Sequence, residues 1–188
     1  MTFPELDTPT EFSPDNFLGS FFRTAKAVLF SPRLFYENMR TEGGLRNPLI
    51  FLVCCVLIHT LLISLLVKNQ TIVFRNITLG IGMPFLTAGI FFLIITRLFK
   101  APGTYEAAFR VTAYAAALHL FSWIPIRWVL VLVEFYRLYL FAIGLGYAFS
   151  IRVSRAALTV VITVITYAVL GSILGYILIG SQAPTPNP

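Results

Sequence analysis

Long apolar segments, separated by short polar ones, dominate the chain after residue 47. At ~1.5 Å per residue, a helix of about 20 residues crosses the ~30 Å hydrocarbon core of a bilayer. Five such segments predict five transmembrane helices, at residues 48–67, 77–99, 105–124, 126–149 and 155–180. The predicted fold class is therefore all-α: a polytopic membrane protein whose five-helix bundle occupies residues 48–180.

The remaining segments are polar or amphipathic. Residues 1–16 and 181–188 are polar and rich in proline, so we expect a disordered tail at each end. Residues 17–47 alternate apolar and basic positions at helical spacing, which predicts amphipathic helices with Phe17, Phe21, Ala25 and Val28 on one face. Such a helix lies in the membrane interface or packs on the cytosolic end of the bundle, and the sequence leaves both open.

Composition agrees with a membrane protein, because 57% of the residues are hydrophobic and only 12% are charged. The formal net charge is +6, but the basic residues are scattered between apolar segments, which excludes a nucleic-acid-binding patch. We interpret them as contacts to anionic lipids of the bilayer and as signals of orientation. Nine Lys and Arg lie in segments on one side of the five predicted spans and three on the other, which places the N-terminus in the cytosol and the C-terminus outside.

Ionisable residues inside the predicted spans are the main candidates for function. Each costs roughly 2.5–3.5 kcal/mol in hydrocarbon and needs a partner. His59, His119, Glu134 and Arg137 lie deepest, and Tyr114, Tyr136 and Tyr139 could add hydroxyl groups. They predict either a polar cavity for an ion, a proton or a lipid headgroup, or a satisfied network that fixes helix register.

Three further features belong to single spans. Glu106 and Arg110 lie four residues apart near the cytosolic end of the third span, so they can form an ion pair. Pro84 removes a backbone donor and predicts a kink in the second span. Gly171 and Gly175 form a small-xxx-small pattern in the fifth span, which serves either packing within the bundle or homo-oligomerisation.

The order of short motifs resembles the Yip1-domain family. The motifs are Ser31-Pro-Arg-Leu-Phe-Tyr-Glu-Asn-Met39, Gly43-Gly44, Pro48-Leu-Ile-Phe51, the stretch from Gly103 to Tyr114, Ile124-Pro125, and Ser150-Ile-Arg-Val-Ser-Arg-Ala156. The resemblance is to prokaryotic members, which implies a location in the cytoplasmic (inner) membrane. Eukaryotic members are linked to Rab GTPases, but their Asp-Leu-Tyr-Gly-Pro motif is absent here, so the resemblance does not carry Rab binding over.

No motif of a catalytic, metal-binding or cofactor-binding site is present, so we expect no enzyme activity, metal or cofactor. The first functional hypothesis is a membrane scaffold or adaptor that binds lipids, itself or another membrane protein. The alternative is a small transporter, a channel-like protein or a lipid-translocating protein that uses the deep Glu/Arg/His cluster.

Overall fold

Helices of very different lengths make up the computed structural model, which describes residues 11–180 and the side chains as far as Tyr176. Residues 1–10 and 181–188, where the sequence predicts disordered tails, lie outside the described residues. The helices are α1 (Phe17–Phe30), α2 (Pro32–Asn38), α3 (Arg46–Leu66), α4 (Gln70–Leu93), α5 (Tyr105–Ala115), α6 (Arg127–Ala148) and α7 (Val153–Gly180). Three short segments complete the order: the 3-10 helices Pro14–Asn16 and Ala116–Leu120, and a π-helical turn, Ile94–Leu98, that extends α4.

Four of the described helices are long and apolar enough to cross a membrane, namely α3, α4 with its π-helical end, α6 and α7. The segment expected as the third span, residues 105–124, is instead the 11-residue helix α5 followed by the five-residue 3-10 helix Ala116–Leu120. Every residue from Ala107 to Leu118 is buried, mostly by α3, α4 and α6. An alanine-rich helix that is enclosed in this way needs no lipid-facing surface, which explains its short length and lower apolarity.

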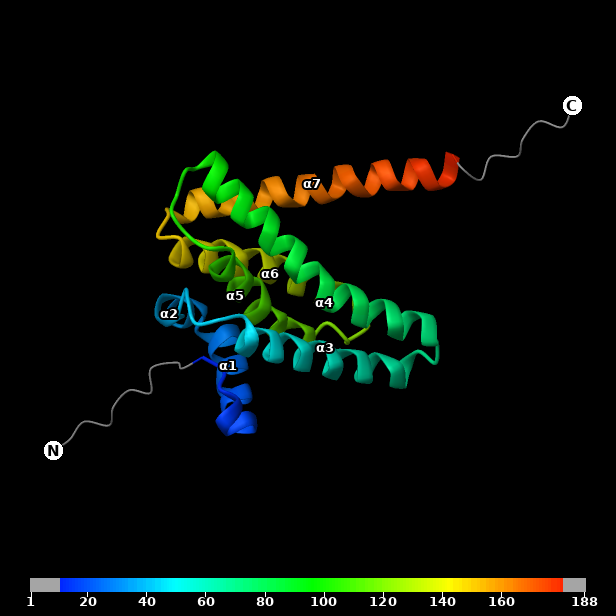
Figure 1. The fold of residues 1–188 in the computed structure, drawn as a ribbon. Helices are drawn as coiled ribbons and strands as arrows, with labels where there is room; N and C mark the ends of the chain where they lie inside the picture. Colours follow the sequence, from blue (N-terminus) through cyan, green and yellow to red (C-terminus); the bar gives the residue numbers. More distant parts are fainter. Residues whose placement is uncertain (1–10, 181–188) are drawn as a thin grey trace, which may run out of the picture.

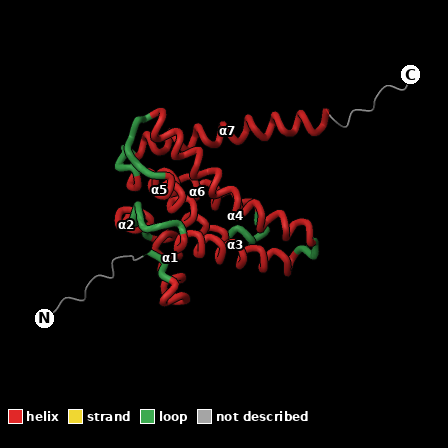
Figure 2. Tube along the Cα trace, in the orientation of Figure 1, coloured by secondary structure: helices red, strands yellow, loops and turns green. Residues whose placement is uncertain are grey.

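Successive helices run in opposite directions through the bundle (Figures 1 and 2). The end of the bundle where α2 packs contains the start of α3, the end of α4, the starts of α5 and α7 and the end of α6. Although α5 is short, α6 returns antiparallel to it, so the alternating order expected for five segments is kept.

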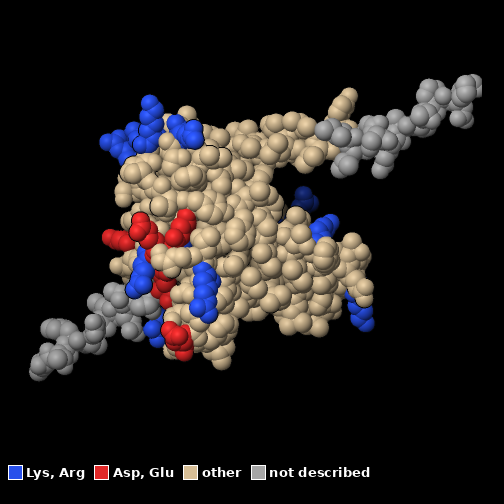
Figure 3. Space-filling view, viewed as in Figure 1, with Lys and Arg blue, Asp and Glu red and all other residues tan. Residues whose placement is uncertain are grey.

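In the space-filling view the visible Asp and Glu and many of the Lys and Arg side chains lie at that same end (Figure 3). A few Lys and Arg lie at the opposite end, and the body of the bundle between the two ends is nearly free of charge. The exposed side chains along α3, α4, α6 and α7 are largely Leu, Ile, Val and Phe. A surface of this kind is stable in hydrocarbon and not in water.

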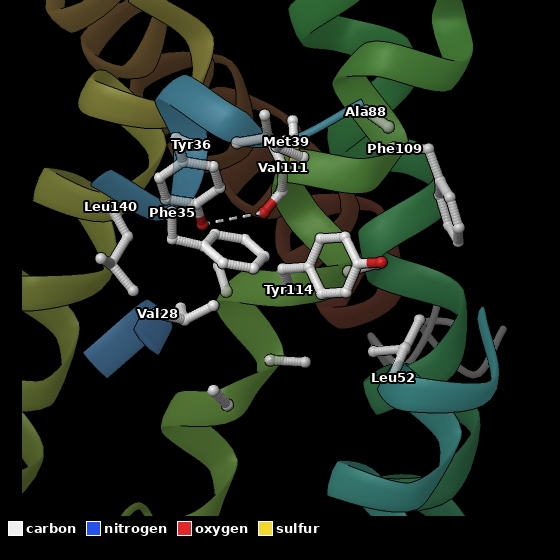
Figure 4. Close-up of a cluster of buried hydrophobic side chains, with 14 of the residues drawn as sticks. Val28, Phe35, Tyr36, Met39, Leu52, Ala88, Phe109, Val111, Tyr114 and Leu140 are labelled. Atoms are coloured by element: carbon white, nitrogen blue, oxygen red, sulfur yellow. Dashed lines mark hydrogen bonds between the residues drawn. The ribbon is translucent and has the colours of Figure 1, made fainter. Parts of the chain in front are cut away.

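Aromatic side chains join the short N-terminal helices to the bundle. Phe35 and Tyr36 of α2 are buried against α5, where Phe35 meets the ring of Tyr114 edge-on at 5.1 Å (Figure 4). The Tyr36 hydroxyl donates a hydrogen bond of 3.4 Å to the Val111 carbonyl, and burial raises the pKa of Tyr36 above its ordinary value. The helical part of the region 17–47 is thus packed onto the core of the bundle, whereas residues 40–44 are exposed.

Helix α1 uses three of the four residues of the predicted apolar face for this packing, and the fourth, Phe17, is 42% exposed. Phe21, Ala25 and Val28 are buried, whereas Arg23 and Lys26 are exposed. The opposite side is also partly apolar, because Leu18, Phe22 and Phe30 are 66–75% exposed. The structure therefore shows the packing of one side of α1 on the bundle, whereas the position of its other side in a membrane interface stays a prediction.

The stretch just before α1 differs from the sequence expectation. Residues 11–16 were expected to belong to a disordered tail, but Phe12 is 1% exposed and packs against Phe17 and Phe51. Glu11 reaches Arg110, 99 residues further along the chain. The sequence could not predict this order, because the stretch is polar and its partners are distant in sequence.

Candidate functional site

A cavity of about 420 Å³ opens between α3, α4, α5, α6 and α7. All four residues of the predicted deep cluster line it: His59 from α3, His119 from the 3-10 helix after α5, and Glu134 and Arg137 from α6. The rest of the wall is mostly apolar, with Leu79, Met83, Leu138, Phe141, Val160 and Val164 among the lining residues. A mostly apolar pocket with a few converging polar groups is the usual form of a site for an amphiphilic ligand.

The two histidines lie against each other, with ring centroids 5.4 Å apart and nearly perpendicular planes. Nδ1 of His59 is 3.1 Å from the His119 carbonyl oxygen, and Nδ1 of His119 is 3.1 Å from the Ala116 carbonyl oxygen. Because a carbonyl oxygen only accepts, both contacts are hydrogen bonds in the tautomer that carries the proton on Nδ1; the Ser122 hydroxyl also lies 3.4 Å from Nδ1 of His59. In the neutral rings Nε2 is then left as a hydrogen-bond acceptor.

Arg137 and Glu134 form an ion pair one turn apart on α6, with 3.4 Å between Nη1 and Oε1. The Glu134 side chain is 60% exposed and that of Arg137 is 25% exposed. These positions are about 11 and 15 Å along the 22-residue helix α6 from its first residue, so the pair lies near the middle of the helix. Among the described side chains Arg137 has only Glu134 as an ion-pair partner, and most of its N–H donors are therefore available to a ligand.

A second polar pair on the cavity wall was not found from the sequence. The hydroxyl groups of Thr87 on α4 and Tyr167 on α7 are 2.9 Å apart and both residues line the cavity. Single hydroxyl residues in apolar helices carry no sequence signal of their own. The three tyrosines that were expected to contribute are not among the residues that line the cavity. Tyr114 donates to Glu11, Tyr136 donates to the Leu29 carbonyl, and the ring of Tyr139 lies against that of Tyr136.

Pro84 also lines the cavity, and α4 stays helical across it. The carbonyl of Pro84 accepts a 3.2 Å hydrogen bond from the Thr112 hydroxyl on α5. The predicted kink at Pro84 stays a prediction, but the residue clearly belongs to the wall of the site.

Glu106 and Arg110 lie outside the cavity, in a network at the charged end of the bundle. Arg110 is 2% exposed and donates to Glu11 (2.6 Å), to Glu106 (3.0 Å) and to the Gly44 carbonyl (2.9 Å). The Gly44 N–H donates to Glu106 at 2.6 Å, and Gly44 has φ of 89°, which glycine adopts without strain. This network connects three segments that are distant in the sequence. Since Nε, Nη1 and Nη2 of Arg110 all donate within it, few N–H donors of Arg110 are available to a ligand.

Gly171 and Gly175 lie on the part of α7 that extends past its neighbours. A Cβ atom at either position would meet nothing within 4 Å, and every residue from Ala168 to Leu174 is exposed. The small-residue pattern is thus unused for packing between the described elements of this chain.

Four apolar spanning helices, an enclosed short helix and an intramembrane polar cavity define a polytopic α-helical membrane protein. Comparison with protein-family models finds the Yip1 domain over residues 26–175. The match covers more than half of the 188 residues, so the chain belongs to the Yip1-domain family, as its motifs indicated. No curated protein and no solved structure matches it significantly.

Proposed function

We propose that this Yip1-domain protein is a non-enzymatic membrane protein that holds a lipid, or an amphiphile of similar shape, in the cavity between α3 and α7. The observation that carries the proposal is the convergence of His59, His119, Glu134 and Arg137 on one cavity whose remaining wall is mostly apolar. A register-fixing network would bury these groups against each other. Instead, the Glu134 side chain is 60% exposed, with Arg137 as its ion-pair partner, at a depth where an exposed charge is costly.

The shape of the cavity fits entry from the bilayer. Beyond the Thr87–Tyr167 pair, α7 continues with exposed side chains all around it, so the cavity wall between α4 and α7 ends there. Figure 3 shows this part of α7 standing away from the rest of the bundle. An acyl chain can follow α7 while its headgroup reaches α6, without passing through water.

Lipid occupancy can be tested by photo-crosslinking the purified protein in vesicles that contain a phospholipid with a diazirine in its acyl chain. We expect labelling of peptides from α4 and α7 that line the cavity. Val164→Trp should reduce labelling of the α4 peptide several-fold, because Val164 lines the cavity and is 47% exposed. Val161→Trp is the matched control, since Val161 is 53% exposed on the same helix but is not part of the lining. Equal effects of the two variants would count against the proposal.

A second candidate, the scaffold or adaptor role, is favoured by the outer side of α1. Leu18, Phe22 and Phe30 are exposed next to Arg23 and Lys26, a combination that fits an anionic membrane surface. In this role the exposed Gly171/Gly175 segment would meet another membrane helix. The charge distribution supports an orientation in which α1, α2 and the N-terminus face the cytosol of a prokaryotic cell and the C-terminus lies outside.

The interfacial position of α1 can be measured with tryptophan fluorescence in vesicles of brominated lipids. In the Phe22→Trp variant the new tryptophan should be quenched by lipids that carry bromine near the headgroup. This quenching should add to any quenching of Trp123 and Trp128 in the wild type. Glu42→Trp is the control, because Glu42 is exposed in the loop between α2 and α3 and should be quenched by aqueous acrylamide instead. If both new tryptophans respond only to acrylamide, α1 lies in water and the surface does not serve a membrane.

A further inference from the structure

The charge of the cavity restricts the chemistry of its ligand. The Arg137–Glu134 pair carries no net charge, and both residues line the cavity. A second positive charge beside Arg137 would be costly at this depth, so both imidazoles are taken as neutral. A ligand with a net charge would leave one member of the Arg137–Glu134 pair uncompensated in hydrocarbon, whereas a ligand with one charge of each sign would compensate both.

We infer that the cavity recognises the zwitterionic headgroup of an amine phospholipid, with the phosphate on Arg137 and the primary ammonium on Glu134. This inference rests on the proposed function and names the class of lipid. The guanidinium of Arg137 offers several N–H donors to phosphate oxygens, which is the geometry that arginine provides best.

The histidines specify the ammonium group. A primary ammonium donates three hydrogen bonds, one of which the Glu134 carboxylate accepts. Each imidazole donates through Nδ1 to a backbone carbonyl, and its Nε2 is an acceptor without a backbone partner among the described residues. Because both rings line the cavity, His59 and His119 offer acceptors for the remaining N–H groups. A trimethylated ammonium has no N–H to donate, so the same wall disfavours a choline headgroup.

The apolar lining accommodates the rest of the lipid. Leu138 and Phe141 continue along α6 beyond the ion pair, and Val160 and Val164 face the cavity from α7. The cavity volume of about 420 Å³ holds a headgroup and the first part of an acyl chain, but not two whole chains. The remaining chain length would lie in the bilayer beside α7.

The inference can be tested by native mass spectrometry of the full chain, released from nanodiscs with equal amounts of phosphatidylethanolamine, phosphatidylglycerol and phosphatidylcholine. We expect retained phosphatidylethanolamine to exceed each of the others by about tenfold, the ratio that one charge-assisted hydrogen bond provides. Glu134→Gln should remove most of the preference over phosphatidylglycerol, and Arg137→Gln should lower retention of all three lipids. Glu37→Gln and Arg75→Gln, which change exposed residues outside the cavity, are the matched controls.

A second measurement needs no variant and so does not depend on how the variants fold. Successive N-methylation of phosphatidylethanolamine should lower its retention by the wild-type protein stepwise, as N–H donors are lost. Equal retention at every methylation step, or a preference for phosphatidylglycerol, would overturn the inference while leaving a lipid-binding cavity. If no lipid is retained at all, the proposed function itself fails. Displacement of the lipid by soluble glycerophosphoethanolamine at similar concentrations would overturn the assignment to a lipid.

Discussion

Replacing Arg110 by methionine should lower the free energy of unfolding by about 3–5 kcal/mol, the usual loss when one partner of a buried ion pair is removed. Arg110 is 2% exposed and holds the carboxylates of Glu11 and Glu106 as well as the Gly44 carbonyl. Methionine fills a similar volume but leaves both carboxylates near each other without a cation. The change is measured by thermal or denaturant unfolding of the purified protein in detergent, followed by near-ultraviolet circular dichroism.

The Arg110 network also provides its own controls. Arg75→Met changes an exposed arginine and should alter stability by less than about 0.5 kcal/mol. Adding Glu11→Gln and Glu106→Gln to Arg110→Met should restore part of the loss, because the uncompensated charges are then gone. An Arg110→Met protein as stable as the wild type would mean that the network does not hold the N-terminal segment.

The second large effect is expected at Phe51, whose replacement by alanine should cost about 3–5 kcal/mol. Phe51 on α3 is fully buried and its ring contacts those of Phe12, Phe21 and Tyr114, at centroid distances of 5.2–6.0 Å. The cavity left by alanine would loosen the contact between the stretch before α1, helix α1 and helix α5. Limited proteolysis should therefore cut before residue 17 faster in Phe51→Ala than in the wild type.

Phe74→Ala is the matched control for Phe51→Ala. Phe74 is 73% exposed on α4, so its loss removes little packing within the chain. We expect it to unfold within about 0.5 kcal/mol of the wild type and to be cleaved at the wild-type rate. If the two alanine variants behaved alike, the aromatic cluster around Phe51 would not be a stabilising core.

The sequence predicted the membrane class because apolar length is a local property of each segment. The bounds of α3, α6 and α7 follow it closely, since a span must match the thickness of the bilayer. The sequence analysis overestimated the length of the helix in residues 105–124, because hydropathy does not distinguish alanines that face lipid from alanines that neighbouring helices enclose. The enclosure of α5 depends on close approach of α4 and α6, which is a tertiary property; at Gly144, for example, a Cβ would lie 2.6 Å from Val111.

The sequence predicted the ionisable residues of the candidate site but not its neutral residues. Ionisable residues in apolar segments are conspicuous because their transfer into hydrocarbon is costly, and depth along each helix brought His59, His119, Glu134 and Arg137 to similar levels. Burial of Thr87 and Tyr167 costs little free energy once their hydroxyl groups are paired, so these residues do not stand out in the hydropathy pattern of the sequence. Glu11 was missed for the opposite reason: a carboxylate in a polar, proline-rich stretch is ordinary, and only the fold shows that Arg110 needs it.

The burial of α5 has a consequence for how this protein is made. Glu106 and Arg110 of α5 bond to Gly44, in the loop between α2 and α3, and to Glu11, in the stretch before α1. Without these partners both charges would be costly in hydrocarbon, so α5 by itself should insert poorly into the membrane. During synthesis it should stay at the translocon until α6 emerges and can cover it, with α4 already in place on its other side. Biogenesis of the whole protein would then depend on the delayed release of one helical hairpin, and a ribosome stalled between α5 and α6 should leave a chain in which α5 is still accessible from the aqueous phase.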